Sequence, residues 1–103
     1  MENIMENNKL IAEFMGYEIQ KDPTERFFGR YKSPIGVWHK EIDLSFHHDW
    51  NWLMEVINKI TTTEEFKDEY EFNQLFWETF NQLDIDEIYT QVISFIKWYN
   101  ENK

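Results

Sequence analysis

The chain of 103 residues has no cysteine, only three glycines and only two prolines. The lack of cysteine excludes disulfides, thiolate chemistry and thiolate-bound zinc or iron–sulfur sites. Few glycines leave little room for a phosphate-binding loop. The motifs of P-loops, dinucleotide-binding folds, nucleophile elbows and EF-hands are also missing. We therefore expect neither a catalytic activity nor a cofactor.

Long apolar runs are missing as well. No stretch approaches the roughly 18 apolar residues that a membrane-spanning helix requires. The first 14 residues lack the basic and apolar regions of a signal peptide. These absences predict a cytoplasmic protein with no membrane partner.

Basic residues are scarce, since 20 Asp and Glu oppose 10 Lys and Arg. Residues 1–60 carry ten acids and seven bases, a net charge of −3, and residues 61–87 carry nine acids and one base, a net charge of −8. A field of this sign disfavours ordinary nucleic-acid binding and attracts basic partners. The alternative is a solvated helix face without a partner.

Aromatic residues, by contrast, are abundant: nine Phe, five Tyr and five Trp. Each ring buries on the order of 150–250 Å², so a few of them can fill a small core. The length suits one domain, residues 1–103. Most rings are expected in its core, and the remainder are candidates for a contact surface.

Residues 4–15 are predicted to form a helix, because five apolar side chains recur on one face. Gly16 follows where a left-handed residue after a helix is expected. Asn7 or Asn8 could instead cap a shorter helix. The apolar residues are Ile4, Leu10, Ile11, Phe14 and Met15.

Three strands are predicted next, at residues 17–21, 26–32 and 37–46. Gly29 suggests a bulge or a close backbone approach in the second. Alternation in the third places one set of side chains on a buried face: Trp38, Ile42, Leu44 and Phe46. Short turns between the strands favour an antiparallel meander.

The second half is predicted to be helical. Asp49 is the expected N-cap of a helix over 50–60, with an apolar stripe of Trp50, Leu53, Met54, Ile57 and Ile60. Thr61–Thr63 before Glu64 and Glu65 resemble another cap, and residues 67–71 could be a loop or a continuation. A further stripe covers 71–83: Phe72, Leu75, Phe76, Phe80 and Leu83.

Asp84 and Glu87 resemble a capping box that opens a final helix, which reaches about residue 100. The order of elements predicts an α+β fold. We expect a small antiparallel three-stranded meander packed with an N-terminal helix and two to three C-terminal helices.

Three segments carry a family resemblance: NKLIAEFMG at 8–16, DWNWLMEVINKI at 49–60 and FIKWYNE at 95–101. They resemble the small proteins of Bacteroidetes and their phages that are grouped around the phage α/β/α (ABA) sandwich domain. The resemblance implies α/β/α layering and a phage or mobile-element setting, hence the host cell cytoplasm. It brings no catalytic motif.

The leading hypothesis is a non-enzymatic protein that binds and inhibits a host machine, such as a CRISPR effector. Its partner would be a host protein or ribonucleoprotein complex with a basic groove. Exposed Trp77 or Trp98 would anchor the contact, and binding would weaken steeply with salt. The acidic candidates are Glu64, Glu65, Asp68, Glu69 and Glu71.

Two other classes stay open. Direct RNA or nucleotide binding would use basic residues of the strand region together with Phe28, Tyr31 and Trp38. These basic candidates are Arg26, Arg30, Lys32 and Lys40. A self-associating accessory protein would bury aromatic rings between protomers, so both a monomer and a homodimer are possible.

A metal site is not expected from the three histidines, His39, His47 and His48. His47 and His48 are adjacent, and neighbours on a strand point in opposite directions, so they converge poorly on one ion. The paired carboxylates lack an apolar wall that would shift a pKa for acid–base catalysis.

Overall fold

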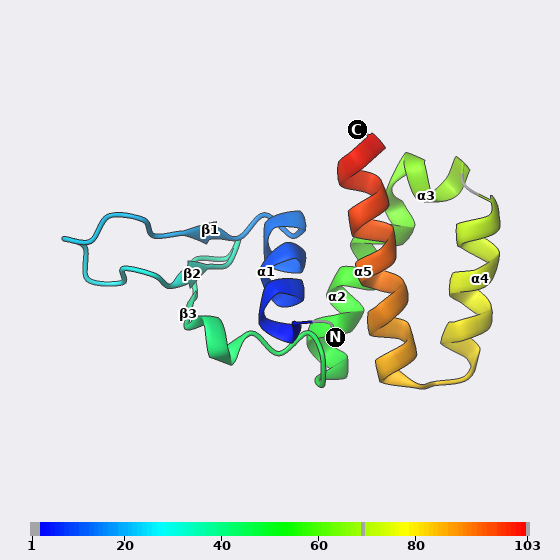
Figure 1. The fold of residues 1–103 in the computed structure, drawn as a ribbon, viewed down its shortest axis with the longest axis horizontal. Helices are drawn as coiled ribbons and strands as arrows, with labels where there is room; N and C mark the ends of the chain where they lie inside the picture. The colour runs from blue at the N-terminus through cyan, green and yellow to red at the C-terminus, as the bar shows by residue number, and fades with distance from the viewer. Residues whose placement is uncertain (1–2, 69, 103) are drawn as a thin grey trace. The chain divides into compact units, whose positions relative to one another are not determined.

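The computed structural model describes residues 3–68 and 70–102, without the side chains of residues 70–72. The chain forms two compact units, Met1–Ser45 and Phe46–Lys103, which we call the meander unit and the helical unit. Among the described residues, a three-stranded antiparallel sheet and five α-helices confirm the predicted α+β class (Figure 1). The single-domain assignment of 1–103 stays a prediction.

The meander unit opens with helix α1 (Ile4–Phe14), as predicted. Its N-cap is Asn3, whose Oδ1 accepts a hydrogen bond from the Glu6 amide at 3.2 Å. The helix therefore does not begin at Asn7 or Asn8. The predicted apolar face is only partly right, because Ile4 is exposed. The buried residues of α1 are Asn7, Asn8, Ile11 and Ala12.

The sheet consists of β1 (Glu18–Ile19), β2 (Tyr31–Lys32) and β3 (Trp38–His39) in the order β1-β2-β3. Both pairs are antiparallel, with Glu18 opposite Lys32 and Lys32 opposite Trp38. The predicted meander is thus confirmed, although its strands are far shorter than the predicted ones. A tight turn holds β2 to β3, since the Ser33 amide donates to the Val37 carbonyl at 2.8 Å.

Gly29 forms the bulge that the sequence suggested. The Gly29 amide donates to the Gln20 carbonyl at 2.9 Å, and the Gln20 amide donates to the Arg30 carbonyl at 3.0 Å. Gln20 therefore faces two residues of the other strand, and Gly29 has a φ of +80°. A glycine in the left-handed region at the first position is typical of this kind of bulge.

The long third strand, residues 37–46, is a wrong prediction. The chain leaves the sheet after His39 and forms a short 3₁₀ helix, η1 (Glu41–Asp43). Lys9 Nζ lies 3.1 Å from Glu41 Oε1, which ties η1 to α1. Ile42 is consequently 75% exposed, although alternation had placed it on the buried face. Leu44 and Phe46 are buried from a loop rather than from a strand.

The helical unit begins with α2 (Trp50–Thr62), capped by Asp49 as predicted, since its carboxylate accepts from the Asn51 amide at 2.9 Å. The buried stripe is Leu53, Val56, Ile57 and Ile60. Trp50 lies at its rim and is exposed, which corrects its predicted core position. Trp52 packs edge-on against Phe46, with ring centroids 5.1 Å apart.

A short helix, α3 (Glu64–Asp68), follows the predicted threonine cap. Thr63 Oγ1 accepts a hydrogen bond from the Phe66 amide at 3.2 Å. The Phe66 ring meets Phe76 edge-on at 5.6 Å and Phe95 at 5.8 Å. Three helices thus join through three phenylalanines, all of them buried. Edge-to-face pairs of this kind contribute about 0.5–1.5 kcal/mol each beyond their buried area.

Helix α4 (Tyr70–Asn81) packs against α3 and α5 (Ile85–Asn102). Of its predicted stripe, Phe76 is buried, whereas Leu75 and Leu83 are exposed. Leu83 lies beyond the helix and has a φ of 55°. Phe72 has its side chain outside the described residues. Asp84 caps α5 as predicted, accepting from the Asp86 amide at 3.0 Å.

None of the helices in the described part of the chain is long and apolar enough to span a bilayer.

Candidate functional site

The predicted acidic site lies around α3. Glu64 and Asp68 are exposed and Glu65 is half-buried. In the described ranges, none of the three forms an ion pair. Glu69 and the side chain of Glu71 lie outside the described residues. Glu64 and Glu65 also stabilise the first turn of α3, because carboxylates suit the positive end of a helix.

More acidic side chains of the helical unit are exposed. Glu78 lies in α4, and Asp86 and Glu87 lie in the first turn of α5. The whole unit carries twelve acids and four bases, a net charge of −8. A net charge of this size on one unit produces a negative field that attracts cationic partners.

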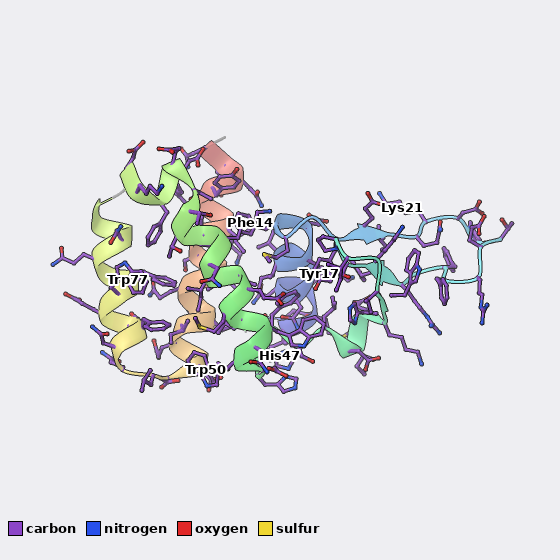
Figure 2. All side chains as sticks on the ribbon, turned by 180° about the vertical axis from the view of Figure 1, so that it is seen from behind. Phe14, Tyr17, Lys21, His47, Trp50 and Trp77 are labelled. Carbon is purple, nitrogen blue, oxygen red and sulfur yellow. The ribbon has the colours of Figure 1, made fainter. Side chains whose placement is uncertain are left out.

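The two candidate anchors differ in accessibility. Trp77 on α4 is 41% exposed (Figure 2). Its ring is held edge-on between Phe76 and Phe80, with centroid distances of 5.4 and 5.5 Å. Trp98 on α5 is half-buried and tilts against Phe95 at 5.8 Å. Trp77 therefore presents the more accessible aromatic surface, on a ring whose orientation is already fixed.

The structure brings three of the four basic candidates together on an aromatic pair. The Phe27 and Trp38 rings stack with centroids 5.0 Å apart and planes 23° apart. The Arg26 and Arg30 guanidinium carbons lie 5.4 and 5.5 Å from the Phe27 centroid. Lys32 Nζ lies 5.9 Å from the Trp38 centroid. Lys40 is exposed but lies outside this group, which we call the cation–aromatic stack.

The sequence indicated different aromatic partners for these cations. Phe28, not Phe27, shares the parity of Arg30 and Lys32, but residues 26–29 form turns rather than a strand, so parity does not decide which way their rings face. Phe28 is instead 55% exposed and outside the stack. Tyr31 is buried, and burial raises the pKa of its phenol, so it offers no open ring.

The histidine pair also differs from its predicted geometry. Residues 46–48 form a turn rather than a strand, so His47 and His48 do not diverge. His47 Nε2 lies 3.0 Å from His48 Nδ1, and the His47 ring meets Tyr89 at 6.3 Å. Burial, reinforced by His48, lowers the pKa of His47. Among the described residues no group of three or more potential metal ligands occurs.

No protein-family model, curated protein or solved structure matches this chain.

Proposed function

We propose that the chain is a non-enzymatic binding protein whose acidic helical unit attaches to a basic surface of a host protein or ribonucleoprotein complex. One observation carries the proposal: unpaired exposed carboxylates of α3 share a compact unit with the accessible ring of Trp77. Carboxylates steer a basic partner and provide specificity, whereas a desolvated tryptophan provides affinity.

A basic groove that normally holds nucleic acid fits this chemistry. Its cations are spaced to neutralise phosphates, and an acidic helix surface would compete for the same charges. The resemblance to phage proteins supports a role against a host defence complex of this kind, such as a CRISPR effector. Occupying the groove would inhibit the complex without any chemical step.

The proposal is tested by capture from a lysate of a Bacteroidetes host that carries such a complex. The immobilised chain should retain a nucleic-acid-handling complex, and raising NaCl from 50 to 300 mM should release it. The triple variant Glu64→Lys/Glu65→Lys/Asp68→Lys should lower capture by roughly tenfold, because it removes the steering charges. Trp77→Ala should lower capture without changing the salt dependence.

A matched control reverses three exposed acids of the meander unit, Glu13→Lys/Glu18→Lys/Glu25→Lys. It changes the net charge by the same amount and should retain capture. Thermal unfolding of each variant establishes that it is folded. Capture that is insensitive to salt, or lost equally in both triple variants, would contradict the proposal.

A further inference from the structure

The cation–aromatic stack spans a structured loop and the strands beside it: Arg26, Phe27 and Arg30 lie between β1 and β2, whereas Lys32 lies in β2 and Trp38 in β3. Residues 21–29 connect β1 to β2 and lie at the end of the sheet remote from α1 (Figure 1). The Asp22 carboxylate accepts from the Thr24 amide and hydroxyl at 2.9 and 2.7 Å, which also lowers its pKa. Two further turns close with hydrogen bonds from Phe28 to Glu25 and from Arg30 to Phe27.

In the described part of the chain, Arg26, Arg30 and Lys32 take part in no ion pair. Glu18 lies opposite Lys32 in the sheet, yet no ion pair joins them. Three cations thus gather on one pair of stacked rings, and cation–π attraction, which is modest at exposed sites, partly offsets their mutual repulsion.

The local charge differs in sign from that of the whole molecule. Residues 21–40 carry five bases and two acids, a net charge of +3, within a chain of net charge −10. Salt screens exposed charges over about 8 Å at physiological ionic strength. The potential at the loop is therefore set mainly by its own cations, which are suited to an anionic ligand.

We propose that the cation–aromatic stack, together with the loop before β2, binds single-stranded nucleic acid, with Arg26, Arg30 and Lys32 contacting successive phosphates. Phe28 follows Phe27 of the stack directly in the chain, and its exposed ring is available for stacking with an unpaired base. Arg side chains and aromatic rings in alternation are typical of surfaces that follow a single strand. In a duplex the bases are already stacked on one another inside the double helix, so a duplex would form only the phosphate contacts with this site.

Fluorescence anisotropy of labelled U15 and dT15 at 50 mM NaCl tests the proposal. The Arg30→Glu/Lys32→Glu variant should lose at least tenfold in affinity, because two phosphate contacts become repulsive. The logarithm of the binding constant should fall with the logarithm of salt concentration with a slope of about −2, as expected for three contacts to a single strand. Phe28→Ala should weaken binding by roughly tenfold through loss of stacking.

The matched control, Lys67→Glu/Lys97→Glu, makes the same charge change in the helical unit and should bind like the parent chain. The acidic reversals at Glu64, Glu65 and Asp68 should not weaken oligonucleotide binding, so this proposal and the acidic-surface proposal can fail independently. Equal loss in the control overturns the inference. So does a Phe28→Ala variant with unchanged affinity together with equal binding of polyphosphate, which lacks bases.

Discussion

Asn8 shows how one side chain can fix the path of a loop. It lies on the buried face of α1, where an apolar residue is the usual choice. Its Nδ2 donates a 3.0 Å hydrogen bond to the Leu44 carbonyl, 36 residues away. Leu44 is itself buried, so water has little access to its carbonyl. Without Asn8, this carbonyl would lose a hydrogen-bond donor that water could not easily replace. The pairing holds the segment after η1 against the first helix.

Asn8→Ala is expected to lower the free energy of unfolding by about 1–3 kcal/mol, because it leaves a buried carbonyl without its donor. Chemical denaturation measures the loss. Asn51→Ala, an exposed substitution in the first turn of α2, is the control and should stay within about 0.5 kcal/mol of the parent. Similar losses in both variants would rule out a specific role for the Asn8 hydrogen bond.

Phe27 illustrates why residue-level assignments fail near a bulge. Simple alternation groups Phe28 with Arg30 and Lys32, because their positions differ by two. Residues 26–29 form turns rather than a strand, so that alternation does not apply, and Phe27 stacks on Trp38 instead. Gly29 suggested a bulge or a close backbone approach, but not that the residues before it leave the strand, because that depends on turn hydrogen bonds such as the one from Arg30 to Phe27.

Among the elements, the strands depart most from their predicted lengths. Two-residue strands bury little surface and are not stable by themselves. Hydrogen bonds within the turns support these strands. In the turn between β2 and β3, for example, the Val37 amide donates to Ser33 Oγ at 3.1 Å. The Lys9–Glu41 ion pair joins η1 to α1, a contact with no sequence signature.

The end of α4 carries local strain that a substitution can relieve. Leu83 has a φ of 55°, a conformation that costs a residue with a side chain about 1–2 kcal/mol. Its side chain is 70% exposed, so little burial would be lost. Leu83→Gly should raise the free energy of unfolding by roughly 0.5–1 kcal/mol, after the greater flexibility of glycine in the unfolded chain is counted.

Leu83→Ala serves as the control for that substitution. Alanine removes most of the side chain but retains a Cβ, so it keeps the backbone strain and should bring no gain. Equal stability of the glycine and alanine variants in thermal denaturation would show that the left-handed conformation is not strained.

At the scale of the whole molecule, charge is the dominant property. A net charge of −10 destabilises a compact state through self-repulsion. The helical unit bears most of it, and α4 has Glu78 in its last turn, where a negative charge also opposes the helix dipole. The cation–aromatic stack concentrates the opposite sign in part of the meander unit.

The unfolding midpoint should therefore rise as NaCl increases from 10 to 200 mM, because the screening length falls below about 10 Å. Asp68→Asn/Glu78→Gln should stabilise the chain at low salt by about 0.3–1 kcal/mol, with a smaller gain at high salt. Glu18→Gln/Glu25→Gln makes the same charge change near the loop cations and should give no gain, since Glu18 lies opposite Lys32. Thermal melts at both salt concentrations measure the difference.

The sequence by itself determined the α+β class, the succession of a helix, a meander and further helices, the Asp49 and Asp84 caps, a threonine cap within residues 61–63, and a bulge or close backbone approach at Gly29. These features depend on local chemistry: a cap requires one oxygen near a few amides, and a left-handed bulge position favours glycine. The uneven charge is likewise a property of composition along the chain.

Only the tertiary structure decided which side chains meet. It placed Phe27 on Trp38, Asn8 on Leu44 and Phe66 between Phe76 and Phe95. It also left Ile42, Leu75 and Leu83 exposed, although their spacing indicated burial. Periodicity reports which face of an ideal element is apolar, whereas burial depends on where the element ends and on which neighbour covers it.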